Sequence, residues 1–182
     1  QDTDSKRWRE IGKDGVLAVF GDSTNIFNLK ETLGEDQVAL HLEELMKDAK
    51  QRVFFAAFAS HMGRNLKVAE IAAQQGRKVC FLGRTINRMI GYSKELGYFP
   101  ASLKNWVIDA EQAAGLPPEK VFIFASGTQG ESGSSLTRLG QGQEVRGLRV
   151  NKGDTVIYSS RMIPGNERPI LDVVSGLYER GA

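Results

Sequence analysis

Val53-Phe54-Phe55-Ala56-Ala57-Phe58 is a run of six apolar residues without a polar interruption. A strand that is apolar throughout is buried on both faces, as in a parallel sheet covered by helices, and Val and Phe favour strands. Further strands are expected at 79–82, 106–108, 121–125 and 154–158, and helices at 63–75, 86–96, 110–114, 134–139 and 169–180. Because strands alternate with helices, we predict an α/β fold, a three-layer α/β/α, doubly wound arrangement around a mainly parallel sheet.

The pattern is less regular on the N-terminal side of this run. The apolar residues 16–20 predict a buried strand that ends in a polar turn, and apolar residues at helical spacing predict a helix over 34–49. The alternation becomes tidy only at Val53. The strand at 16–20 and the helix after it are therefore also compatible with a separate layer.

The composition narrows the class of protein. The chain has 182 residues, 41% of them hydrophobic and 25% charged, which suits one domain or slightly more and excludes disorder. No apolar stretch approaches the ~18–20 residues needed to span a bilayer, and residues 1–10 contain no signal-peptide core. The single cysteine, Cys80, excludes a disulfide scaffold, suits a reducing cytoplasm, and lies inside an apolar strand as expected for a buried hydrophobe. Gln1 stands where Met is usual, so we expect a piece of a longer protein.

The turns after the expected strands share one chemistry. Each contains small hydroxyls or glycines, and three of the four contain an arginine. The residues are Ser60, His61 and Arg64 after 53–58, Gly83, Arg84 and Thr85 after 79–82, Gly127, Thr128 and Gln129 after 121–125, and Ser159, Ser160 and Arg161 after 154–158. Ligands of open parallel sheets bind outside the carboxyl ends of the strands, so these residues form a candidate site.

The residue types at these ends favour a phosphate-bearing ligand. Glycine lets the backbone approach a ligand, serine and threonine donate to phosphate oxygens, and arginine adds bidentate, charge-assisted contacts. Any single turn of this kind is ordinary, but agreement among four turns is informative. The spacing matches neither a Walker loop nor a dinucleotide fingerprint, so a polymer backbone is favoured over a free nucleotide. The net charge of +2 does not decide between them.

Metal-ligand candidates are sparse. The two histidines, His41 and His61, are too few for most multi-histidine centres. His61 follows a strand and can contact a ligand, a metal or only the turn, whereas His41 lies in a predicted helix. Asp22 lies in the polar turn expected after the run 16–20, a position that suits either a turn residue or a carboxylate metal ligand. Trp8 and Trp106 favour packing over base stacking.

Several ordered segments resemble the ribonuclease J family, in the β-CASP branch of the metallo-β-lactamase superfamily. They are Gly15-Val-Leu-Ala-Val-Phe-Gly-Asp-Ser-Thr-Asn25, Phe58-Ala-Ser60 with Arg64, Gly76-Arg-Lys-Val79, Gly83-Arg84, Gly127-Thr-Gln-Gly-Glu131, Gly153-Asp-Thr-Val-Ile157, and Ser159-Ser through Ile163-Pro-Gly-Asn-Glu167. The resemblance is collinear from about Gly12 to Ala182. In one departure, Thr128 replaces the more usual serine and keeps a hydroxyl.

The resemblance implies a function for the parent protein. Family members are cytoplasmic RNA-processing nucleases with 5′→3′ exonuclease and endonuclease activity, and a two-metal zinc site activates water for phosphodiester hydrolysis. Most of the ligands come from a His-x-His-x-Asp-His motif that this chain lacks, and Asp22 corresponds to the bridging aspartate. The resemblance divides the chain into 1–30, a remnant of the nuclease domain, and 31–182, the β-CASP domain that clamps RNA.

We therefore interpret the chain as the RNA-binding β-CASP domain of a zinc-dependent ribonuclease, inactive by itself because most metal ligands are absent. The expected partners are RNA and the rest of the parent, which we expect to be a homo-oligomer without a membrane association. The expected RNA- or phosphate-binding residues are Ser60, His61, Arg64, Arg84, Gly127, Thr128, Gln129, Ser159, Ser160 and Arg161. The alternative is a stand-alone doubly wound module for a phosphorylated small molecule or a protein partner.

Overall fold

The structure, a computed structural model, describes residues 4–21 and 33–182. The chain divides into two compact units, Gln1–Leu33 and Gly34–Ala182. The first contains the helix α1 (Ser5–Asp14), whose N-cap Asp4 accepts a hydrogen bond from the Arg7 backbone. The second contains the sheet. The assignment of residues 1–30 to a different domain remains a prediction.

The described residues of the second unit form a five-stranded sheet in which every neighbouring pair is parallel. The strands are β1 (Val53–Ala56), β2 (Lys78–Leu82), β3 (Val107–Ile108), β4 (Val121–Ala125) and β5 (Thr155–Tyr158). Their order is β3-β2-β4-β1-β5, and in the register Phe54 lies between Ile123 and Val156. The predicted parallel sheet is confirmed.

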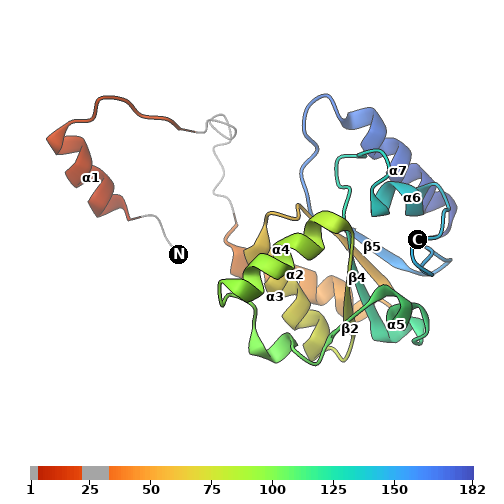
Figure 1. Ribbon diagram of the computed structural model, residues 1–182. Helices are drawn as coiled ribbons and strands as arrows, with labels where there is room; N and C mark the ends of the chain where they lie inside the picture. Colours follow the sequence, from red (N-terminus) through yellow and green to blue (C-terminus); the bar gives the residue numbers. More distant parts are fainter. Residues whose placement is uncertain (1–3, 22–32) are drawn as a thin grey trace. The chain divides into compact units, whose positions relative to one another are not determined.

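Helices cover both faces of this sheet (Figure 1). On one face lie α2 (Glu35–Asp48), α3 (Met62–Gln74), α4 (Arg84–Glu95) and the short 3₁₀ turn η1 (Ala101–Leu103). On the other lie α5 (Ala110–Ala114), α6 (Ser135–Gly140) and α7 (Glu167–Glu179). A second 3₁₀ turn, η2 (Pro118–Lys120), directly precedes β4. The predicted three-layer α/β/α fold is therefore confirmed.

Alternate strand residues supply the two halves of the core. Phe55, Phe81, Phe122 and Phe124 face α2, α3 and α4, and their rings contact one another with centroids 4.8–5.9 Å apart. The alternate residues of the same strands face α5, α6 and α7. Helices cover both faces of the sheet, which explains why the strands are continuous apolar runs in the sequence.

Some predicted elements need correction. Residues 16–20 form no strand in the described part of the chain, and Leu17 and Phe20 are fully exposed in their own unit, since no neighbouring strand pairs with them. The predicted strand 53–58 ends at Ala56. The helix α2 does not form a separate layer, because Met46 is completely buried in the sheet core. No helix among the described residues has the length and apolar character to cross a membrane.

Of three residues that could have reactive or stacking roles, Cys80 and Trp106 are accounted for by their surroundings. Cys80 is buried in the sheet, and burial raises the pKa of its thiol to about 12, so it is not a thiolate nucleophile. Trp106 is half-buried against the core, with the Lys78 ammonium 5.0 Å from its ring centroid. Trp8 lies on α1 and is exposed, so its packing role is not seen among the described residues.

The helices α6 and α7 touch backbone to backbone through glycine. A Cβ placed on Gly176 of α7 would lie 2.1 Å from the carbonyl oxygen of Gly140 in α6. Gly91 in α4 is also helical, but a Cβ there would meet nothing within 4 Å. The two glycines therefore serve different purposes.

We predict opposite effects for Gly176→Ala and Gly91→Ala on the free energy of unfolding in urea. Gly176→Ala forces α6 and α7 apart and should lose about 1–3 kcal/mol. Gly91→Ala adds helix propensity without a clash and should gain about 0.5–1 kcal/mol. Equal stability of the Gly176→Ala protein and the unsubstituted chain would contradict the close contact.

Candidate nucleic-acid interface

The loops that follow the strands meet at one edge of the sheet, because all the strands run in the same direction. The loops after β1 and β5 are neighbours at one end of this edge, and the loops after β2, β3 and β4 are neighbours at the other. This arrangement brings together the predicted site residues from position 60 to position 161. Asp22, the predicted metal ligand, lies outside the described residues.

The β1–β5 end carries a cluster that we call the Arg64 cluster: Glu35, His61, Arg64 and Ser159. Arg64 donates from Nε and Nη2 to the two carboxylate oxygens of Glu35, at 2.9 and 2.6 Å. Its Nη1 donates to Ser159 Oγ at 3.3 Å. His61 Nε2 lies 3.7 Å from the same carboxylate. The guanidinium is therefore fixed in place, and an internal carboxylate occupies its fork.

The charges in this cluster compensate one another. The hydrogen bond from Arg64 lowers the pKa of the Glu35 carboxyl against the raising effect of partial burial, and the charge of Arg64 and the proximity of His61 lower it further. The Glu35 side chain is 52% exposed and that of Arg64 20% exposed. Solvent can therefore reach the pair, and an incoming anion can compete for the guanidinium.

The loop after β4 is an internal brace. Gln129 is buried; its amide donates to the Arg161 carbonyl at 3.0 Å, and its Oε1 accepts from the Ile163 backbone at 2.9 Å. Thr128 is also buried, and its carbonyl accepts a hydrogen bond from the Tyr158 hydroxyl. Burial raises the pKa of Tyr158 to about 12, which keeps this donor protonated. These side chains hold the loop after β5 in position, and their contact with a ligand remains a prediction.

The other predicted residues lie around this brace. Gly127 has a φ of +115°, and a Cβ there would collide with the Ser134 side chain, so the turn requires glycine. Ser60 is exposed in the turn before α3. Ser160 Oγ is buried without a hydrogen-bond partner among the described residues, a state that an incoming acceptor would relieve. Arg161 has an exposed side chain.

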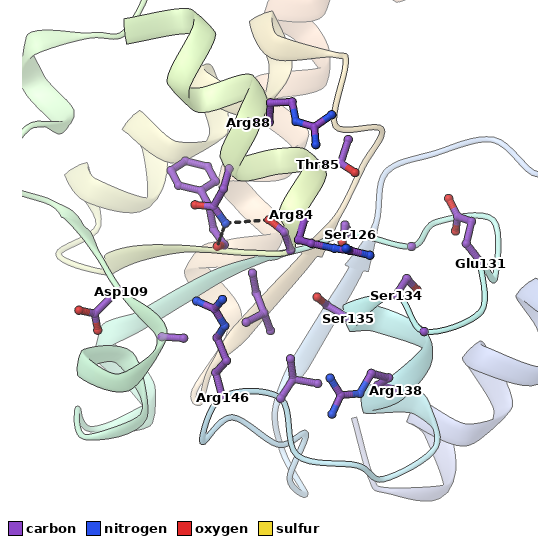
Figure 2. A pocket seen from close by; sticks show the side chains of 18 of the residues that line it. Arg84, Thr85, Arg88, Asp109, Ser126, Glu131, Ser134, Ser135, Arg138 and Arg146 are labelled. Atoms are coloured by element: carbon purple, nitrogen blue, oxygen red, sulfur yellow. Dashed lines mark hydrogen bonds between the residues drawn. The ribbon is translucent and has the colours of Figure 1, made fainter.

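The β2–β4 end opens into a cavity of about 890 Å³ that we call the arginine pocket (Figure 2). Arg84 and Arg88 extend into it from α4, Arg138 comes from α6, and Arg146 comes from the turn between Val145 and Leu148. Asp109 and Glu131 are the acidic side chains in its lining. Of these residues, only Arg84 is among the predicted site residues.

Some of the site residues that were not predicted could have been found from the sequence, and others could not. Arg88 lies four residues after the predicted Arg84 in one helix, so its place on the same helix face was predictable from the spacing. Glu35 and Arg64 are 29 residues apart and meet only because α2 packs beside α3. Arg146 depends on an uncommon local backbone, with a φ of +51°. No local pattern in the sequence signals Glu35 or Arg146.

The described residues do not make a metal centre by themselves. Within 4–21 and 33–182, no group of three histidine, cysteine, aspartate or glutamate side chains converges on one point. The donor set that zinc requires is thus not assembled by these residues. We derive no chemical step through a metal from this part of the chain.

Comparisons with known proteins point to one family. A family model described as the ribonuclease J β-CASP domain matches residues 50–177. A ribonuclease J of Sinorhizobium meliloti is 37% identical over 179 residues, covering 98% of this chain and 31% of the relative. A ribonuclease J of Mycolicibacterium smegmatis is 35% identical over 180 residues, covering 99% and 32%. A ribonuclease J of Thermus thermophilus is 36% identical, covering 95% and 30%. The chain spans about a third of the length of these relatives.

We predict that Gln129→Ala destabilises the domain by about 1–3 kcal/mol, because it removes two hydrogen bonds of a buried side chain, one to the Arg161 carbonyl and one from the Ile163 backbone. The measurement is urea unfolding, with Gln141→Ala, an exposed position at the end of α6, as the control. A Gln129→Ala protein as stable as the control would show that the brace does not support the fold.

We also predict a pH-dependent role for Glu35. Because its folded pKa is lowered, the ion pair stabilises the fold above the ordinary carboxyl range, and this contribution disappears as pH falls through the folded pKa. The stability difference between the unsubstituted chain and Glu35→Gln should be below about 1 kcal/mol near neutral pH, since the pair is solvent-exposed, and vanish in acid. The control is Glu44→Gln, which removes an exposed carboxyl of the same helix that forms no ion pair among the described residues.

Proposed function

The chain belongs to the ribonuclease J β-CASP domain family, and from this we propose that it is the RNA-binding domain of a ribonuclease J-like, metal-dependent nuclease. The observation that carries the proposal is the convergence of arginines and hydroxyls at the carboxyl edge of the sheet. Relatives that cover nearly the whole chain are named ribonuclease J, which supports RNA as the polyanion.

The proposed contacts follow from the geometry of the Arg64 cluster. A phosphodiester presents two oxygens that match the guanidinium fork as a carboxylate does. RNA bound here would replace Glu35 on Arg64 and accept hydrogen bonds from Ser60, Ser159 and Ser160. Arg84 and Arg161 would hold neighbouring phosphates. Such contacts read the backbone rather than the bases, so the domain would grip RNA without strong sequence preference.

For the whole parent protein we propose phosphodiester hydrolysis in the cytoplasm by a homo-oligomer, with 5′→3′ exonuclease and endonuclease activity. We propose that zinc supplies the activated water and that Asp22 is one of its ligands, the others coming from the rest of the parent. The relatives are about three times as long as this chain, which supports a further catalytic part. We expect this chain alone not to cleave RNA.

We predict that binding of a short single-stranded RNA weakens with added salt and depends on Arg64. Arg64→Ala should lower the affinity roughly tenfold and reduce the slope of log affinity against log salt by about 0.7. Glu35→Gln should raise the affinity, because it removes the competing carboxylate.

The matched control is Lys120→Ala, which removes one positive charge at the opposite edge, directly before β4. It should leave both the affinity and the salt slope nearly unchanged. Fluorescence anisotropy of a labelled oligonucleotide measures all four proteins. Equal losses in Arg64→Ala and Lys120→Ala would mean that general charge, not this edge, attracts RNA.

A further inference from the structure

The arginine pocket differs electrostatically from the Arg64 cluster. Among the described residues, none of its four arginines forms an ion pair, whereas Arg64 is paired with Glu35. The four guanidinium groups therefore line one cavity, and none of them is in an ion pair with an acidic side chain of the described residues. Like charges held together repel, and the repulsion is relieved when an anion enters.

The two acidic side chains in the lining are used elsewhere. Asp109 caps α5 by accepting from the Gln112 backbone at 2.7 Å. Glu131 accepts from the Gln129 backbone at 2.9 Å, within the brace. Neither carboxylate makes a salt bridge to an arginine of the pocket within the described part of the chain. The pocket is thus built with cationic groups that its own acids do not neutralise.

One of the arginines is held ready in position. Arg138 donates from Nε to Gln143 Oε1 and from Nη2 to the Glu144 carbonyl, both at 3.1 Å. Both acceptors are uncharged, so they orient the guanidinium and leave its charge intact. Figure 2 shows Arg138 and Arg146 on the wall opposite Thr85 and Arg88. A ligand between these walls would contact guanidinium groups from both sides.

The size and lining of the pocket indicate more than a single inorganic ion. A volume of about 890 Å³ is in the range of sites for organic ligands. Phe81, Val107 and Val145 contribute apolar surface, and Ser126 and Thr85 contribute hydroxyls. Phosphates suit the arginines and hydroxyls, while a planar ring suits the apolar surface or the face of a guanidinium.

Close packing of two loops keeps this arrangement in place. Gly83 has a φ of +140°, and a Cβ there would lie 2.2 Å from Ser126 Oγ. The absence of that Cβ lets the start of α4, with Arg84 and Arg88, lie against the loop after β4. The pocket therefore forms from the fold itself rather than from surface side chains that happen to gather.

We propose that the arginine pocket binds a nucleotide through its phosphate groups, either as one unit of an RNA strand or as a free nucleoside diphosphate. The site shares no residue with the Arg64 cluster. The inference rests on the proposed function only where the nucleotide is part of RNA. Binding of a free nucleotide depends on the pocket alone.

The test uses the full chain, ADP without metal, and a labelled single-stranded hexauridylate. Arg88→Gln/Arg146→Gln removes two charges that have no hydrogen-bond partner among the described residues. The control, Lys104→Gln/Lys120→Gln, removes two exposed charges outside both the pocket and the Arg64 cluster. Thermal unfolding checks that both proteins remain folded. Isothermal titration calorimetry measures the affinity for ADP, and fluorescence anisotropy measures the affinity for the labelled RNA.

We expect the pocket variant to lose at least about tenfold in affinity for one of the two probes, as for lost charge-assisted contacts. A loss for RNA with little ADP binding assigns the pocket to the strand, and a loss for ADP alone assigns it to free nucleotide. Unchanged affinity for both probes in the folded pocket variant, or no binding of either probe to the unsubstituted chain, would overturn the inference. ADP binding that is lost in the pocket variant, without RNA binding, would reject the proposed function and keep the pocket. RNA binding that depends on Arg64, together with affinities for RNA and ADP that do not depend on Arg88 and Arg146, would keep the proposed function and reject the pocket.

Discussion

The common direction of the strands is the constraint on which the rest of the structure depends. Parallel strands cannot be joined by tight turns, so each connection carries a helix and both faces of the sheet become covered. The same direction places every carboxyl end at one edge. Loops separated by a hundred positions, such as those with Ser60 and Ser160, are then neighbours although no local sequence pattern links them. The candidate ligand-binding edge is a consequence of the way the core is built.

The sequence predicted the strands of the core well because burial on both faces leaves a simple pattern. Residues 121–125 are all buried and are an uninterrupted apolar run. The same rule failed at residues 16–20, since an apolar run becomes a strand only where another strand pairs with it. The helix α2 was predicted, but its layer was left open although Met46 is completely buried, because a helical pattern does not show which sheet the helix covers.

The candidate site was predictable where it follows directly from a strand end and not where it depends on tertiary packing. Arg64 and Ser159 were placed at the correct edge, but their contact with Glu35 requires the packing of α2 beside α3. Gln129 was expected to face a ligand, yet its side chain points into the protein and fixes the loop after β5. A polar residue in a strand-end turn can serve the turn or the ligand, and only the surrounding structure distinguishes these roles.

The two ends of the edge would contribute differently to the capture of a polyanion. The arginines of the pocket have no acidic partner among the described residues, so their field extends into solvent and attracts phosphate from a distance of about one Debye length, ~8–10 Å. Arg64 is neutralised by Glu35 and exerts little long-range attraction; it gains a phosphate only by giving up a carboxylate. Only a ligand whose oxygens match the guanidinium fork can replace the carboxylate, so this contact discriminates by geometry as well as by charge. An anion that is drawn to the pocket but cannot also match the fork of Arg64 would be held at one end alone, and an extended phosphodiester chain is the kind of ligand that can satisfy both.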